Sequence, residues 1–140
     1  MTLPGSLAGL RQTRLLEGEE AKEVVDKLHG RGVTPRRNLV AEYAGARGSA
    51  TLYYSQYGGA DEAESAGRKM AEKIREGNSP FTAPVEMDRG GKKIYLCGGL
   101  GQQHYFFPAG DGLYWLAVDP EISSAALSEL LVPLMLEDPI

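Results

Sequence analysis

Three extended segments of this chain each run through a short turn into an amphipathic helix, and this pattern constrains the fold most. The segments are residues 13–16, 55–57 and 117–119, and the turns that follow are acidic or contain glycine or proline. At each junction the side-chain period changes from two residues to 3.6 residues, as it does where a strand meets a covering helix. The pattern predicts strands packed against helices, but it does not indicate an activity or a ligand.

Helices are predicted at residues 17–28, 61–76 and 120–132. In each of them apolar side chains recur every three or four positions and so form one buried stripe. The stripe of residues 61–76 consists of small and medium side chains, which permits close approach to a sheet. Glu64 and Arg68 stand four positions apart in this helix, and we expect them to form an ion pair worth about 0.2–0.5 kcal/mol.

Six strands are predicted, joined by turns that are rich in glycine. They span residues 39–43, 50–57, 85–88, 92–97, 103–107 and 113–118. We therefore predict a single α+β domain over residues 1–140, with an irregular lead-in at 1–12 and a mainly antiparallel sheet of about five or six strands. The expected order is helix, two strands, helix, four strands, helix, with the helices packed mostly on one face of the sheet.

The composition is that of an ordinary globular protein, with 42% apolar and 24% charged residues in a chain of 140. The net charge of −4 argues against general nucleic-acid binding, which needs a basic surface. No apolar run approaches the roughly 20 residues that span a bilayer, and residues 1–11 lack the features of a signal peptide. We expect a cytoplasmic protein by default, although the mature form of an exported protein would fit the same observations.

Cys97 is the only cysteine, so the chain forms no internal disulfide and no zinc site built from several cysteines. Together with Gly99, Gly101 and His104 it outlines one candidate pocket. A thiol beside an imidazole can act as a nucleophile if both side chains share a face within hydrogen-bond distance. The alternative, which we favour, is that Cys97 is a small buried apolar side chain.

The glycine loop at residues 98–101 differs from a phosphate site. A phosphate cradle needs a helix N-terminus directly after the glycines, whereas residues 102–107 are typical of a strand. The two histidines, His29 and His104, lie on distant elements without the spacing of metal ligands. We therefore expect no cofactor and no metal site.

Arg31, Arg36 and Arg37 form the most basic stretch of the chain, in a predicted loop. Such a group can dock phosphate, an anionic lipid surface or an acidic partner. The alternative is that these arginines are ordinary exposed charge, which is the commoner case.

Aromatic side chains are concentrated in the predicted strands. Five of them are candidate binding residues: Tyr53, Tyr95, Tyr105, Tyr114 and Trp115. Adjacent strand residues point to opposite faces, so a sheet covered on one face only would display several tyrosines on the other, as recognition surfaces do. The alternative is that other segments cover the rings, or that the rings pair across strands and stabilise the sheet.

These observations favour a non-enzymatic binding or assembly module that uses a tyrosine-rich sheet face. Its partner is expected to be another protein or, in a homodimer, a second copy of the chain. The alternative is a protein that binds a small molecule or a cofactor, haem and metal included, or an enzyme with a weak signature, with its pocket near Cys97 and His104. Enzymatic activity is the less expected outcome, because no catalytic motif stands out.

Overall fold

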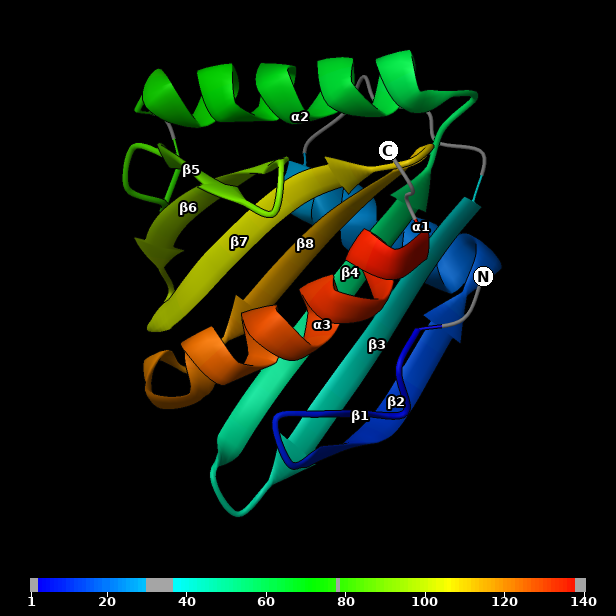
Figure 1. Ribbon diagram of the computed structural model, residues 1–140, viewed down its shortest axis with the longest axis vertical. Coiled ribbons are helices and arrows are strands. Elements are labelled where there is room, and N and C mark those ends of the chain that lie inside the picture. Colours follow the sequence, from blue (N-terminus) through cyan, green and yellow to red (C-terminus); the bar gives the residue numbers. More distant parts are fainter. Residues whose placement is uncertain (1–2, 30–36, 78, 138–140) are drawn as a thin grey trace.

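In the computed structural model, which describes residues 3–29, 37–77 and 79–137, eight strands form one antiparallel sheet with helices on both faces (Figure 1). The strands are β1 (Ser6–Leu7), β2 (Leu10–Glu17), β3 (Arg37–Gly45), β4 (Gly48–Gln56), β5 (Val85–Arg89), β6 (Lys92–Gly99), β7 (Gln102–Ala109) and β8 (Gly112–Val118). The helices are α1 (Gly18–His29), α2 (Ala60–Arg75) and α3 (Ser123–Glu137), and a short 3₁₀ helix, η1 (Pro120–Ile122), precedes α3. The strand order in the sheet is β1-β2-β3-β4-β8-β7-β6-β5. Within the described residues, no helix is both long and apolar enough to cross a membrane.

The predicted α+β architecture and antiparallel sheet are confirmed, but the described residues form eight strands rather than five or six. The additional strands are β1 and β2, and β1 and the start of β2 lie in the segment predicted to be irregular. Positive φ angles at Ala8 and Gly9 turn the chain back between them. Leu10 is completely buried. A register shift within β2 changes which side chains face the core, so the sequence of this strand shows no clear alternation.

The predicted hairpins are present as β3–β4, β5–β6 and β7–β8. Because β6 also pairs with β7, the last four strands form a continuous antiparallel run. Pairing of β4 with β8 joins this run to the first half of the chain and sets Tyr53 opposite Trp115. β8 lies near the centre of the sheet, and every one of its residues is buried.

The helices cover both faces of the sheet. α1 packs over β2 and β3, and α2 packs over β7 and β8 on the same face. α3 crosses the opposite face, at the front of Figure 1. Tyr114 therefore lies in the α3 layer, whereas the next residue, Trp115, lies in the α2 layer. Two helices share a face, as predicted, but α3 leaves the central strands with no open face.

The connection between α2 and β5 packs tightly against the end of β6. The backbone N–H of Thr82 donates to the carbonyl oxygen of Gly98 at 2.8 Å, and the N–H of Gly98 donates to Thr82 Oγ1 at 2.9 Å. A Cβ atom at Gly99 would stand 2.7 Å from Phe81 Cδ1 and 2.8 Å from the carbonyl oxygen of Pro80. Close packing therefore requires glycine at position 99. This explains one of the glycines in the loop at residues 98–101.

Replacing Gly99 by alanine is expected to lower the free energy of unfolding by about 1–3 kcal/mol, because the neighbouring backbone must move to admit the methyl group. Gly98→Ala is the matched control, since its Cβ atom would meet only Thr82 Oγ1, at 3.9 Å. Urea denaturation followed by circular dichroism measures both variants. Equal losses of stability in the two would contradict this packing.

Candidate functional site

Cys97 and His104, the ends of the predicted pocket, are direct partners in the pairing of β6 with β7. They therefore point to the same face of the sheet, toward the α2 layer. Trp115 Nε1–H donates to His104 Nδ1 at 2.9 Å. Since an indole N–H can only donate, the imidazole carries its proton on Nε2, which donates to the carbonyl oxygen of Gly99 at 2.9 Å. Gly101 lies apart, in the exposed β6–β7 turn, with a φ of 76°.

The electrostatics of Cys97 and His104 are those of a buried structural pair. Burial raises the pKa of the Cys97 thiol from its ordinary value of 9.0 to about 11. Burial lowers the pKa of His104, against a smaller opposing effect of the hydrogen bond to Gly99. A reactive thiolate beside an imidazolium needs the reverse of both shifts. The His104 ring also contacts Phe81 and Trp115, with centroids 4.8 Å and 5.6 Å apart, so a structural role fits this pair best.

Four of the five aromatic residues predicted to bind a partner are buried. Tyr105 and Tyr114 lie in the α3 layer, at 6% and 1% exposure. Tyr95 and Trp115 lie in the α2 layer, at 3% and 1% exposure. Tyr53 is half-buried. These rings do not form the exposed surface expected from the sequence, because the α2 layer encloses Tyr95 and Trp115 and the α3 layer encloses Tyr105 and Tyr114.

The arginine stretch is described only in part. Arg31 and Arg36 lie outside the described residues, and Arg37 is exposed at the start of β3. Anion docking by this stretch stays a prediction.

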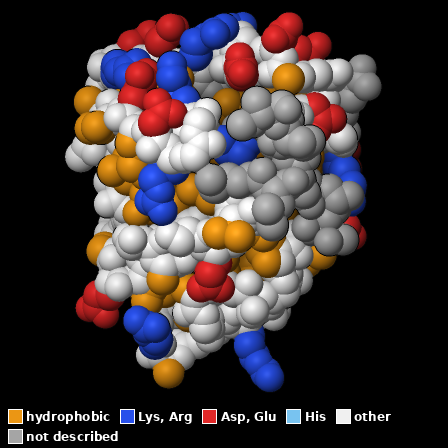
Figure 2. Space-filling model, in the orientation of Figure 1, with side chains coloured by type: hydrophobic (Ala, Val, Ile, Leu, Met, Phe, Trp, Pro, Cys, Tyr) orange, Lys and Arg blue, Asp and Glu red, His pale blue; other side chains and the backbone are white. Residues whose placement is uncertain are grey.

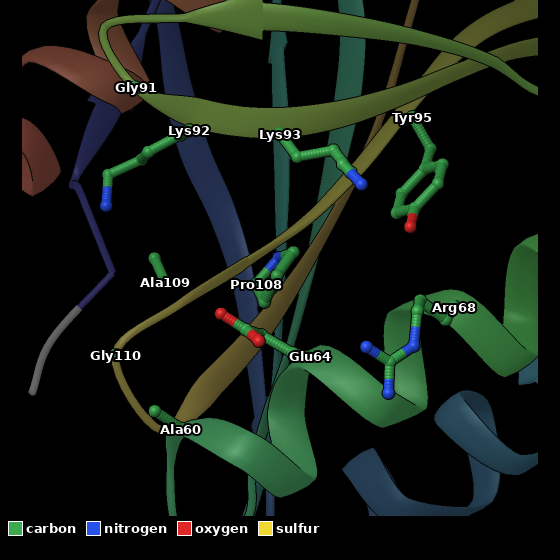
Figure 3. Close-up of a pocket in the computed structure, with 10 residues that line it drawn as sticks. All are labelled: Ala60, Glu64, Arg68, Gly91, Lys92, Lys93, Tyr95, Pro108, Ala109 and Gly110. Carbon is green, nitrogen blue, oxygen red and sulfur yellow. The ribbon is translucent and has the colours of Figure 1, made fainter.

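A cleft of about 440 Å³ lies between α2 and the β5–β6 and β7–β8 turns (Figure 3). Its lining residues are Ala60, Glu64, Arg68, Gly91, Lys92, Lys93, Tyr95, Pro108, Ala109 and Gly110. The first three belong to α2, the next four to β6 and the turn before it, and the last three to β7 and the turn after it. The cleft therefore brings together segments from both halves of the chain.

Local structure explains why charged groups gather in this cleft. Glu64 and Arg68 are one turn apart on α2 and share a side of the helix. Lys93 and Tyr95 are two residues apart on β6 and share a face of the strand. In Figure 3 the first pair projects from α2, and the second pair approaches from β6 on the other side. Gly67 faces the sheet, and a Cβ atom there would make ordinary van der Waals contact with Leu113 Cδ1 at 3.5 Å and with Tyr95 Cε2 at 3.8 Å.

The charge of the cleft is opposite to that of the chain. The lining contains three basic residues, Arg68, Lys92 and Lys93, and one acidic residue, Glu64, whereas the whole chain carries a net charge of −4. Lys92 is buried, and alternation along β6 turns its side chain away from the face of Lys93, so the exposed basic side chains are those of Arg68 and Lys93. Figure 2 shows charged side chains of both signs gathered along α2, at the top of the view, with fewer on the face that carries α3. The cleft is thus a local positive site in an acidic protein.

The charges of Glu64 and Arg68 are not neutralised within the described part of the chain. The ion pair predicted between them is not formed, and no oppositely charged group of the described residues lies within 4.0 Å of either side chain. Lys93 reaches Glu86 at 4.0 Å, and Glu86 is shared with Arg75 at 3.9 Å. Glu64 and Arg68 are therefore available to a ligand.

The sequence named Tyr95 for a different surface, the tyrosine-rich sheet face, and did not predict the charged residues of the cleft. Arg68 and Lys93 look like ordinary exposed charge on a helix and a strand. No residue pattern indicates that α2 lies beside the β7–β8 turn, and only that placement brings these charges together.

Neither a metal-binding cluster nor a known relative identifies the site. In residues 3–29, 37–77 and 79–137, no group of three His, Cys, Asp or Glu side chains could hold a metal ion. No protein-family model matches the chain, and searches of curated proteins and of solved structures found no match. The function is therefore argued from the cleft itself.

Protonation of His104 should destabilise the folded protein. Burial lowers the pKa of His104 below its ordinary value of 6.5, so the unfolded chain binds a proton at pH values where the folded chain does not. The free energy of unfolding should be highest above about pH 6.5 and fall below it, by at most about 1.4 kcal/mol per pH unit. Urea denaturation over a pH series measures this slope, and His104→Gln should flatten it. A slope that His104→Gln leaves unchanged would contradict the neutral, doubly hydrogen-bonded imidazole.

Proposed function

We propose that this protein is a non-enzymatic module that binds a small molecule with a negatively charged group in the cleft beside α2. The observation that carries the proposal is the surplus of basic over acidic residues in the lining of this cleft, in a chain that is acidic overall. Arg68 and Lys93 would contact the negative group, and Tyr95 would form part of the wall.

The size and chemistry of the cleft support such a ligand. Small-molecule sites usually measure about 300–1,000 Å³, and this cleft measures about 440 Å³. A guanidinium binds a carboxylate or phosphate through two parallel hydrogen bonds, and an ammonium adds a compact positive charge. Because no carboxylate of the described residues lies within 4.0 Å of Arg68, a ligand would not have to displace an internal partner.

Binding is proposed rather than catalysis because of the side chains that line the cleft. The ten lining residues include no serine, threonine, cysteine or histidine. A serine, threonine or cysteine nucleophile with a histidine base, one common arrangement for covalent catalysis, is therefore not among them. The Cys97 thiol is buried in the core layer beneath α2. The His104 imidazole lies in the same layer and is hydrogen-bonded to Trp115 and to the carbonyl oxygen of Gly99.

A protein partner or a second copy of the chain is the second candidate. The observation in its favour is β5, the last strand of the sheet, which begins with Val85 at 61% exposure. Glu86 and Asp88 in the same strand oppose pairing of two β5 edges, because charged edge residues discourage such contacts. Tyr53, the half-buried member of the predicted aromatic set, is the other residue that such a partner would contact. The small-molecule proposal is preferred because a defined cleft supports it.

Isothermal titration calorimetry at low ionic strength tests the proposal, with phosphate, pyrophosphate, succinate and glutamate as probes. At least one probe is expected to bind. Arg68→Gln should weaken its affinity about tenfold or more, since the variant loses a charged hydrogen-bond donor. Lys69→Gln is the matched control, because it removes the neighbouring exposed charge that does not line the cleft, and it should leave the affinity unchanged.

Two outcomes would contradict the proposal. One is that none of the probes binds. The other is an equal loss of affinity in Arg68→Gln and Lys69→Gln, which would indicate attraction to the general charge of α2 rather than to the cleft.

A further inference from the structure

Glu64 distinguishes the cleft from a simple anion site. It is the one carboxylate among the lining residues, and in Figure 3 it projects from α2 into the same space as Arg68. Within the described residues, no basic group lies within 4.0 Å of its carboxylate. A purely anionic ligand held by Arg68 would therefore meet a negative charge that no internal ion pair offsets.

The charged groups are spaced so that a small bipolar molecule can span them. Residues four positions apart on a helix have Cβ atoms about 5–6 Å apart, and Glu64 and Arg68 are both exposed on α2. Lys93 faces them from β6. The distance from Lys93 Nζ to Glu86 Oε2 is 4.0 Å, which is at the upper limit for an ion pair. Positive charge is thus concentrated around Arg68 and Lys93, and negative charge at Glu64.

We infer that the ligand is a small amino carboxylate, such as an amino acid, bound with its carboxylate at Arg68 and Lys93 and its protonated amine at Glu64. This inference rests on the proposed function, because it assigns the ligand of the same cleft. Pro108 and Ala109 supply an apolar wall against which the carbon skeleton of the ligand lies.

Ligands with charge of one sign only fit the cleft less well. A dicarboxylate gains from Arg68 and Lys93 but is repelled by Glu64. A diamine gains from Glu64 but meets the basic side chains of the lining. In an amino carboxylate, the carboxylate meets the basic side chains and the protonated amine meets Glu64, so each charged group of the ligand faces a charge of opposite sign. Dicarboxylates and diamines each place one group against a charge of the same sign, which disfavours their binding.

Isothermal titration calorimetry on the full chain tests this inference with pairs of probes that differ only in the amino group. The pairs are β-alanine with propionate and glutamate with glutarate. At least one amino carboxylate is expected to bind about tenfold or more tightly than its deaminated counterpart. Glu64→Gln should abolish this preference without weakening the binding of the deaminated acid. Glu72→Gln, which changes an exposed α2 carboxylate outside the cleft, should retain the preference.

The outcomes separate this inference from the proposed function. If the deaminated acids bind the wild-type protein as tightly as the amino carboxylates, or if the preference survives Glu64→Gln, the amino carboxylate assignment is wrong and the anion site stands. If no probe of either kind binds, and the anions named above do not bind either, both the assignment and the proposed function are wrong.

Discussion

The antiparallel pairing of β4 with β8 is the contact on which the rest of the structure depends. It sets Tyr53 opposite Trp115 on the face of α1 and α2, and it brings Tyr54 to Tyr114 on the α3 face, with ring centroids 4.9 Å apart. The chain leaves β4 into α2, so this pairing also carries α2 across to β7 and β8. The cleft, built from α2 and from turns of the second half of the chain, exists because of it.

Much of the fold could be predicted from local patterns, because hairpins and amphipathic helices are encoded by neighbouring residues. The strands from β3 to β8 and the three helices followed from alternation, glycine turns and apolar stripes. Residues 13–16 of β2 were recognised as an extended segment, but β1 and the start of β2 were missed, because a register shift in β2 and a tight turn at Ala8 and Gly9 conceal their alternation. The face that each helix covers depends on the path of the chain between elements, and side-chain periodicity does not record that path.

The candidate site was less predictable, for related reasons. Strand register does bring Cys97 beside His104, as one alternative required, but the hydrogen bonds from Trp115 and to Gly99 occupy both imidazole nitrogens. The buried tyrosines could not be told from exposed ones until α3 was placed. Arg68 lies on a helix that looks uniformly charged on its outer side, and only its position beside a turn far along the chain marks it as part of a cleft.

The most direct measurement of where a ligand binds is a titration of the full chain with glutamate, followed in amide NMR spectra. The structure predicts that the largest shift changes occur at residues 60–68, 91–95 and 109–110, which surround the cleft. Changes centred on residues 97–104 or on α3, or no changes at a high glutamate concentration, would contradict the cleft as the binding site.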